Sequence, residues 1–131
     1  MPLATDQPAH LVELEREECL RLLASTTLGR IAVNAPGWPP VIRPVTYAFD
    51  QRSQSVVFGS AEGSKLTTLL RSERAAFEID GLDAPGRGWS VIVVGPVEEI
   101  TIAAERERLG ATAHRHLMRL RATVVSGRRL D

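Results

Sequence analysis

The chain alternates between stretches with helical periodicity and stretches in which every second residue is apolar. Glu13–Ser25 carries apolar residues at helical spacing behind an acidic start, which predicts a helix. Leu28–Asn34 then switches to a period of two, with Ile31 and Val33 on one face, which predicts a strand. A turn rich in proline and glycine, Ala35–Pro40, separates this strand from the next.

Short strand patterns continue along the rest of the chain, separated by turns and brief helical segments. Further strands are predicted at Val41–Phe49, Ser55–Gly59, Arg74–Asp80, Trp89–Thr101 and Ala122–Ser126. A short helix is predicted after Lys65 through about Leu70, and helical character, weakened by Gly110, over Ala103–Arg121. Gly95-Pro96 interrupts the longest strand, which predicts a bulge or a barrel corner. Six strands with a few short helices fit a small barrel.

The composition fits one ordinary domain and excludes several classes of protein. The 131 residues suit a single domain, 1–131, in which residues 1–10 form a flexible lead without the features of a secretory signal. The 16 basic and 16 acidic residues cancel, so we expect no nucleic-acid partner and no anionic membrane partner. No apolar run is long enough to span a bilayer, and we expect a cytoplasmic protein. Cys19, the single cysteine, excludes an internal disulfide and is expected to pack.

The strongest local signal for a binding site is the segment from Phe58 to Lys65, in which a predicted strand runs through a glycine- and serine-containing turn into a helix. Free backbone N–H groups at a helix start attract anions. Ser60 and Ser64 can add hydroxyl donors, and Lys65, the only lysine, adds a positive charge. This combination can hold a phosphate monoester. The alternative is a serine-capped helix with a solvated lysine, and the segment alone leaves both open.

Other positions stand out because their residue types are unusual for their surroundings. Arg43 lies in an otherwise apolar strand, where it either binds a phosphate in a forked geometry or faces solvent. Pro44 has no N–H to donate, which predicts an edge or an irregularity in that strand. Trp89 follows a predicted loop, Gly81–Gly88, and either covers a planar ligand or seals the end of the barrel.

No grouping typical of acid–base catalysis or of metal binding emerges from the sequence. His114 and His116 lie two positions apart, on different sides of a predicted helix. Without nearby cysteines or a clustered carboxylate they indicate solvated side chains and no metal site. No serine–histidine–acid or cysteine–histidine set is found either, and catalytic residues remain unassigned. This favours chemistry carried by a bound cofactor.

Several segments, taken in order, resemble one family. They are Leu28–Val33, Pro44–Tyr47 with Asp50, Phe58–Lys65, Ala76–Asp80, Gly88–Val91 with Gly95, and Val125–Arg129. No single segment is specific, but the ordered set resembles the pyridoxamine 5'-phosphate oxidase-like FMN-binding split barrels, in particular their short bacterial members. The resemblance extends from about Leu11 to Leu130.

The resemblance implies a mainly β fold, a six-stranded antiparallel Greek-key split barrel with small flanking helices. It implies a homodimer that binds FMN in the groove between its two chains, with Ser64 and Lys65 on the phosphate. The other flavin contacts it implies are Arg43, Pro44, Val45, Thr46, Phe58, Gly59, Ser60, Trp89 and Ser90. Ser90 replaces a glutamine of the oxidases proper, and Ala48 stands where those enzymes have a lysine that reaches the substrate.

The function that this resemblance implies is a flavin-dependent oxidoreductase acting on an unidentified small-molecule substrate. Relatives of the fold also bind a deazaflavin coenzyme or haem, so the alternative is a non-catalytic protein that binds or sequesters such a group. A barrel with an empty cleft that serves as an interaction module is a third possibility. Because of Ala48, and because the chain stops soon after Arg129, we do not expect useful oxidation of pyridoxamine 5'-phosphate itself.

Overall fold

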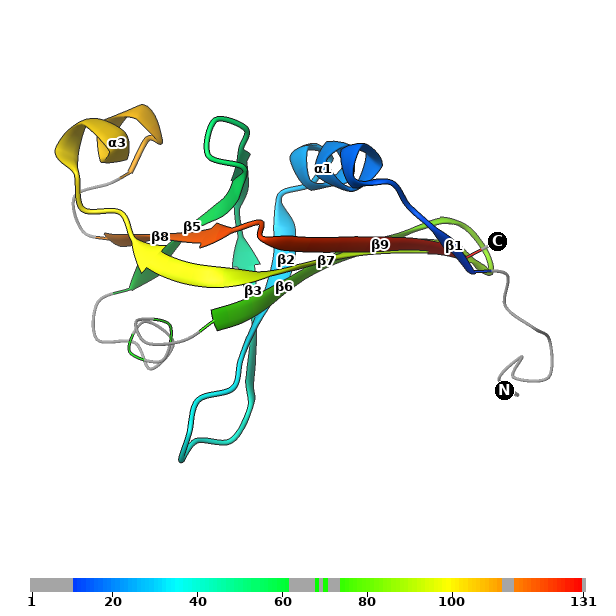
Figure 1. Cartoon of the computed structure of the whole chain (residues 1–131), viewed down its shortest axis with the longest axis horizontal. Coiled ribbons are helices and arrows are strands. Elements are labelled where there is room, and N and C mark those ends of the chain that lie inside the picture. Colours follow the sequence, from blue (N-terminus) through cyan, green and yellow to red (C-terminus); the bar gives the residue numbers. More distant parts are fainter. Residues whose placement is uncertain (1–10, 62–67, 69, 71–73, 112–114, 131) are drawn as a thin grey trace.

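The computed structural model describes residues 11–61, 68, 70, 74–111 and 115–130. Helices α1 and α3 and nine strands follow one another along the chain (Figure 1). Their bounds are β1 Leu11–Glu13, α1 Arg16–Ser25, β2 Leu28–Val33, β3 Val41–Thr46, β4 Ala48–Asp50, β5 Ser55–Ala61, β6 Arg74–Ala84, β7 Arg87–Glu99, α3 Ala103–Arg108, β8 Arg115–Arg121 and β9 Val124–Leu130. The predicted lead and the helix after Lys65 lie mostly outside the described residues, although Thr68 and Leu70 are helical.

All strand pairs are antiparallel, in the order β3-β2-β6-β7-β8-β5-β4, and β9 pairs with both β7 and β1. This confirms the mainly β, antiparallel class, and the curled sheet fits a split barrel. The predicted number of six strands was wrong, since the described residues form nine. Most of the expected loop Gly81–Gly88 extends β6 and β7 into one long hairpin, which lengthens two strands without adding one. Part of the difference in number arises at β1 and β8, which were not predicted as strands. Another part arises at Tyr47, which separates β3 from β4.

The predicted helix over Ala103–Arg121 was also wrong beyond its first turns. Helix α3 ends at Arg108, and Gly110 follows with φ +71°, a left-handed conformation that suits a glycine after a helix. The chain then forms β8, whose Met118 and Leu120 pack in the main core while Leu117 packs in a second cluster on the other face. A strand buried on both faces has no alternating pattern, so periodicity could not distinguish it from a helix.

Strand β7 changes its partner at Gly95-Pro96, where the sequence predicted an interruption. Gly88–Val94 pair with β9, and Val97–Glu99 pair with β8. At the junction a Cβ on Gly95 would collide with the backbone carbonyl oxygen of Arg121, so only glycine allows this close approach. The strand itself continues to Glu99, so the predicted interruption is a change of partner within β7, which fits the barrel corner of the two alternatives.

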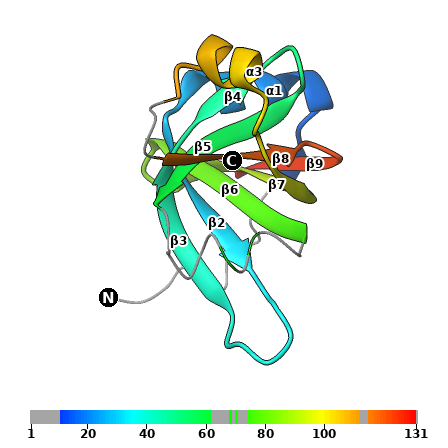
Figure 2. The same cartoon turned by 90° about the vertical axis from the view of Figure 1, so that its left-hand side faces the viewer.

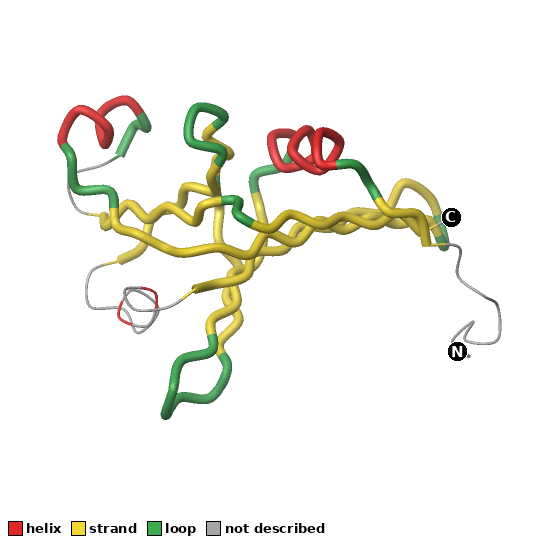
Figure 3. Tube along the Cα trace, in the orientation of Figure 1, coloured by secondary structure: helices red, strands yellow, loops and turns green. Residues whose placement is uncertain are grey.

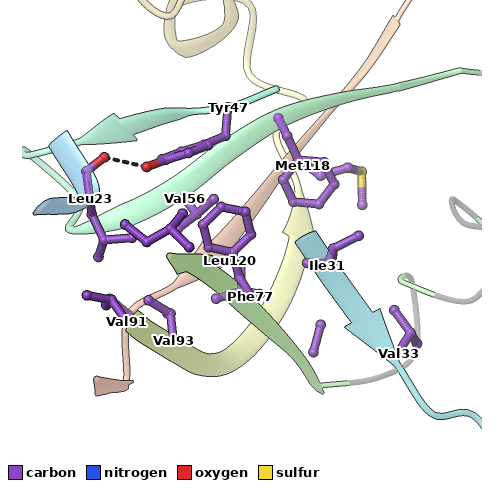
Figure 4. Close-up of a cluster of buried hydrophobic side chains, with 14 of the residues drawn as sticks. Leu23, Ile31, Val33, Tyr47, Val56, Phe77, Val91, Val93, Met118 and Leu120 are labelled. Atoms are coloured by element: carbon purple, nitrogen blue, oxygen red, sulfur yellow. Dashed lines mark hydrogen bonds between the residues drawn. The ribbon is translucent and has the colours of Figure 1, made fainter. Parts of the chain in front are cut away.

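The main core lies between the sheet and helix α1, which begins at Arg16, later than predicted, because β1 occupies Glu13. Figure 4 shows part of this cluster, in which Phe77 packs edge-on against Tyr47 with ring centroids 4.7 Å apart. The Tyr47 hydroxyl donates a hydrogen bond of 2.6 Å to the backbone carbonyl of Leu23 and so fastens the helix to the barrel. Cys19 is fully buried, which confirms its packing role.

The two faces of the long sheet differ in what covers them. Helices α1 and α3 both lie above the strands in Figure 3, and α1 lies over the β7–β9 part of the sheet (Figure 1). No described element covers the opposite face of β2, β6, β7 and β9. The β2–β3 hairpin extends away from the helices on that side (Figure 2). The covered face carries the core, and the other face is therefore where a binding site is to be sought.

Candidate functional site

The uncovered side of the sheet, called the open face here, is defined by three rows of side chains set by the strand register. The first row is Ile42, Ala32, Ala76, Val94 and Val124, and the second is Pro44, Arg30, Glu78, Ile92 and Ser126. The third contains Thr46, Leu28, Asp80, Ser90 and Arg128. Directly opposed residues of paired strands share a face, so the first two rows run straight across the sheet. The third consists of two separately paired parts, Thr46–Leu28 and Asp80–Ser90–Arg128, because the pairing of β2 with β6 ends at Arg30 and Glu78. The first row is entirely apolar.

The open face is hollowed along its length. A cavity of about 440 Å³ lies at the Ser90–Arg128 end, beside Leu82 and Leu130. A second, of about 330 Å³, lies over Glu78 and its neighbours, and a third, of about 360 Å³, lies along the apolar row from Ile42 to Val94. These volumes are within the range of sites that hold small organic molecules.

Large apolar side chains are exposed around these hollows. Ile42 is 64% exposed, Leu82 82% and Ile92 41%, and Leu11, Leu28 and Val124 are exposed on the same face. Contiguous exposed apolar surface on one face of a small domain marks a binding or association surface. The open face therefore has the shape and the chemistry of a site for an apolar ligand, a protein partner, or both.

A polar cluster of Arg30, Glu78 and Asp80 lies in the middle of the open face. The Arg30 guanidinium donates from Nη2 to Asp80 Oδ1 at 3.2 Å, and its Nη1 lies 3.5 Å from Glu78 Oε1. Glu78 Oε1 is itself buried, yet no hydrogen bond reaches it from the described residues. One cation thus faces two carboxylates, one of which has an unsatisfied oxygen.

Burial raises the pKa of Glu78 to about 7, and the hydrogen bond and negative charge of Asp80 add to that increase. The positive charge of Arg30 acts in the opposite direction but is weakened by solvent, because the arginine side chain is 42% exposed. The sequence interpretation missed this cluster. The alternation Phe77-Glu78-Ile79-Asp80 was its signal, because period two places both carboxylates on the face opposite the core.

Three of the predicted flavin contacts, Pro44, Thr46 and Ser90, lie on the open face. Pro44 and Thr46 are exposed on β3, which is an edge strand, as the proline predicted. Ser90 is half-buried between Asp80 and Arg128. The structure thus brings these three to one surface, with β2 and β6 between β3 and β7.

Trp89 is directed to the opposite side from Ser90, as successive residues of a strand must be. It packs against the main core, and a Cβ on Gly81 would lie 2.7 Å from its indole ring. This placement fits the interpretation in which the tryptophan packs within the fold, and Trp89 also borders the cavity of about 440 Å³ at the Ser90–Arg128 end. Arg43 and Val45 are likewise directed to the opposite side of β3 from Pro44. Val45 packs against the core. Arg43 is exposed, and its Nη1 donates a hydrogen bond of 3.0 Å to the Ile42 carbonyl.

The predicted contacts on β5 lie deeper in the fold. Phe58 is 2% exposed and belongs to the main core, and Ser60 is 5% exposed. Gly59 is half-buried opposite Leu117 of β8. Phe58 therefore supports the barrel wall and has no free surface for a ligand. Ser64 and Lys65, the predicted phosphate ligands, lie outside the described residues.

His116 differs from its prediction as a solvated helical side chain. It lies on β8, is half-buried, and its Nδ1 is 2.8 Å from Glu99 Oε2. This pair bridges β8 and β7 on the other half of the barrel. His114 lies outside the described residues.

Among the described residues, no helix has the length and apolar character needed to cross a membrane.

Comparison with known proteins identifies a family and several similar proteins. The family model for pyridoxamine 5'-phosphate oxidase matches residues 15–129. The uncharacterized protein Rv0080 of Mycobacterium tuberculosis is 33% identical over 123 residues, which cover 88% of this chain and 78% of that protein. Among solved structures, an FAD binding protein from Mycobacterium smegmatis is 30% identical with a TM-score of 0.77, covering 93% of this chain and all of the other. A putative pyridoxamine 5'-phosphate oxidase from Corynebacterium glutamicum is 25% identical with a TM-score of 0.78, over 92% of this chain and 93% of that one.

Proposed function

The chain belongs to the pyridoxamine 5'-phosphate oxidase family, and from that premise we propose that it binds a flavin nucleotide on the open face and works as a homodimer. The observation that carries the proposal is the open face itself. It is hollowed, rich in exposed apolar side chains, and left uncovered by every described element. A second copy and a bound ring system together cover it most simply.

The residues of the open face fit an isoalloxazine ring in part. That ring system is flat, with an apolar dimethylbenzene end and a polar pyrimidine end. The row from Ile42 to Val124 offers apolar contacts, while Ser90 and Arg30 offer donors one or two rows away. The phosphate end of the flavin is assigned to Ser64 and Lys65, which lie outside the described residues, so that part of the fit rests on sequence.

A bound flavin supplies hydride or electron transfer, and the protein's part is to hold it, exclude water and admit a substrate. The apolar row and the second copy exclude water from the ring. Ser90 and Arg30 are proposed to orient its polar edge. On this basis we propose an FMN-dependent oxidoreductase of a small-molecule substrate. The flavin exchanges electrons with the substrate, and the protein side chains hold the two together.

The choice between flavins is part of the proposal. FMN was implied by the family resemblance, and the similar protein from M. smegmatis is an FAD binding protein. FAD contains the whole of FMN, so the same ring and first phosphate contacts serve both. The extra adenylate of FAD needs further surface, for which the cavity beside Leu82 and Arg128 has room.

The test is the absorbance spectrum of the protein as purified, followed by titration of the flavin-free protein with riboflavin, FMN and FAD. Saturable binding of a flavin supports the proposal, and tighter binding of FMN or of FAD decides between the two. A deazaflavin and haem are titrated in parallel, and preference for either of these would contradict the flavin assignment. Light scattering gives the oligomeric state in the same samples, where a strict monomer at micromolar concentration would contradict the homodimer.

Turnover separates an enzyme from a flavin-sequestering protein. Flavin-loaded protein is mixed with a nicotinamide reductant under anaerobic conditions, and bleaching of the flavin is followed. Reduction faster than that of free flavin supports an oxidoreductase. Tight binding without any accelerated reduction by this or other small reductants favours the non-catalytic alternative.

A further inference from the structure

The polar cluster on the open face has an unbalanced charge. Arg30 supplies one positive charge, and Glu78 and Asp80 supply two negative charges when both are ionised. The cluster then carries a net charge of minus one. Adding a single proton to one of the two carboxylates makes the whole cluster neutral. The proton can then form a hydrogen bond between the two carboxyl groups.

The surroundings of the cluster make that charge costly once the face is covered. Ile92 lies directly opposite Glu78 on β7, and the apolar row that includes Ala32 and Ala76 runs alongside. The second row offers only uncharged residues beyond Arg30, namely Pro44, Ile92 and Ser126. Among the described residues both carboxylates form ion pairs with Arg30 alone, and Arg128 lies in the third row on the far side of Ser90 from Asp80. A second chain seated on the open face would therefore remove water from two carboxylates that share one paired cation.

A second copy is the partner that this surface fits. The open face carries guanidinium groups, Arg74 at one end and Arg128 at the other, on either side of the central carboxylates. A copy related by a twofold axis presents the same mixture of signs, so the two faces can meet without accumulating like charge.

We propose that pairing of two chains through the open face is linked to a proton at the Glu78–Asp80–Arg30 cluster, so that the pair forms with the cluster neutral and loosens when the proton leaves. This inference rests on the homodimer of the proposed function and adds its regulation.

The direction of the pH dependence follows from which state, the pair or the single chain, binds the proton more tightly. Covering the face disfavours the ionised form of Glu78, so the paired state binds the proton more tightly than the single chain does. The raised pKa of Glu78 in the single chain, about 7, already places the transition near neutral pH. Pairing is therefore unaffected at lower pH and weakens as the pH rises above about 7, by up to about tenfold in the dissociation constant for each proton and each pH unit.

The experiment measures the dimer dissociation constant by sedimentation equilibrium from about pH 6 to about pH 9 at constant ionic strength, on the protein as purified. The wild type is expected to loosen at least about tenfold over the upper half of this range. Glu78→Gln keeps the shape and is neutral throughout, so it is expected to stay paired with a flat profile. Asp80→Asn leaves Arg30 facing one carboxylate, which is expected to move the transition to lower pH and to make it shallower.

Glu98→Gln is the matched control, because Glu98 is an exposed carboxylate of β7 that pairs with Arg121 at 2.6 Å in the other half of the barrel. It should keep the wild-type profile. A flat wild-type profile, or a Glu78→Gln profile as steep as that of the wild type, would overturn the proton link while leaving the homodimer standing. A chain that stays monomeric at every pH would overturn both, and the flavin titration would still report on binding independently.

Discussion

The thiol of Cys19 on α1 occupies the space that a side chain at position 127 of β9 would need. A Cβ built on Gly127 would lie 2.5 Å from Cys19 Sγ and 3.2 Å from the Leu14 side chain. Leu14, in the link between β1 and α1, also donates its backbone N–H to the Gly127 carbonyl at 2.9 Å, so the chain entering the helix is tied to β9 at this point. The single cysteine and this glycine are thus the two halves of one helix-to-sheet contact.

Gly127→Ala is therefore expected to destabilise the fold by about 1–3 kcal/mol through overpacking. Urea denaturation measures this change in the free energy of unfolding. In the double variant with Cys19→Ala the added methyl group gains the space that the sulfur leaves. The double variant should consequently be less destabilised than the sum of the two single variants. Strict additivity would show that the two positions do not share this space.

A second prediction concerns Asp50, which is buried and accepts hydrogen bonds from Arg108 Nη1 and Nη2 at 3.1 and 2.9 Å. Asp50→Asn loses this charge-assisted pairing and is expected to cost about 1–3 kcal/mol at neutral pH. The hydrogen bonds from Arg108 hold the pKa of Asp50 well below its ordinary value of 3.8. Its stabilising effect is therefore complete above about pH 4 and is lost as the pH falls below that value.

The measurement for Asp50 is the urea midpoint of wild type and variant as a function of pH. The two curves should converge on the acid side, since protonation removes from the wild type what the substitution has already removed. Arg21→Ala serves as a control, because its ion pair with Glu18 lies on the surface of α1 and should leave the midpoint unchanged. Parallel curves for Asp50→Asn and wild type down to low pH would contradict the role given to Asp50.

The opposite directions of Trp89 and Ser90 give a third prediction. Ser90→Phe places a large ring in the hollow of the open face and should weaken flavin binding by more than about tenfold with little loss of stability. Trp89→Leu removes core packing and should lower the free energy of unfolding by about 1–3 kcal/mol. Its effect on flavin affinity should be smaller than that of Ser90→Phe, because Trp89 only borders the cavity. Fluorescence titration and urea denaturation of both variants distinguish the two effects. If the two variants behaved in the reverse way, the flavin would lie on the covered face.

A fourth prediction rests on the sequence of the phosphate segment. Lys65→Ala should weaken FMN by about 1.5–3 kcal/mol and riboflavin far less, because riboflavin has no phosphate for the ammonium group to contact. Isothermal titration with both ligands measures the difference. Equal losses for the two ligands would place Lys65 away from the phosphate.

The fifth prediction is that the protein does not oxidise pyridoxamine 5'-phosphate efficiently, despite the name of its family. That substrate carries its own phosphate and needs a second set of cationic contacts. Ala48, exposed on β4, supplies no charge where the oxidases proper are expected to have a lysine. Missing charged contacts at about 1.5–3 kcal/mol each reduce efficiency by orders of magnitude. Pyridoxal phosphate formation under air is the assay, and turnover on the order of 1 per second would contradict this interpretation.

The sequence predicted the parts of the fold that have a one-sided pattern. Leu28–Val33 alternates because only one of its faces meets the core, and α1 shows helical spacing for the same reason. Strand β8 was mistaken for a helix because cores lie on both of its sides. The loop around Gly86 was predicted to be too long, as Gly81–Gly88. Most of these residues belong to an exposed hairpin, and exposed strand residues have little apolar alternation.

The candidate site was predictable only as a set of segments. Motif resemblance led to Pro44, Thr46 and Ser90, but it could not say that Trp89 faces the other way or that Phe58 is enclosed. The alternation of apolar and acidic residues from Phe77 to Asp80 was enough to predict that Glu78 and Asp80 share one face of the strand. Their pairing with Arg30, which is 48 positions from Glu78 along the chain, depends on the register of β2 with β6, and no local pattern specifies that register.

The partner change of β7 at Gly95-Pro96 has a consequence for the synthesis of the protein. Both segments that pair along that edge of β7 come from the last part of the described chain, β8 and β9, and β1 at its beginning also pairs with β9. While residues 115–130 are still inside the ribosome, β5, β7 and β1 each have an edge without its partner strand. The barrel must therefore close late, through contacts between distant parts of the sequence, which is the slow kind of folding. During that interval the nascent chain exposes strand edges to its neighbours, so the step most sensitive to chaperones and to expression temperature should be the arrival of β9.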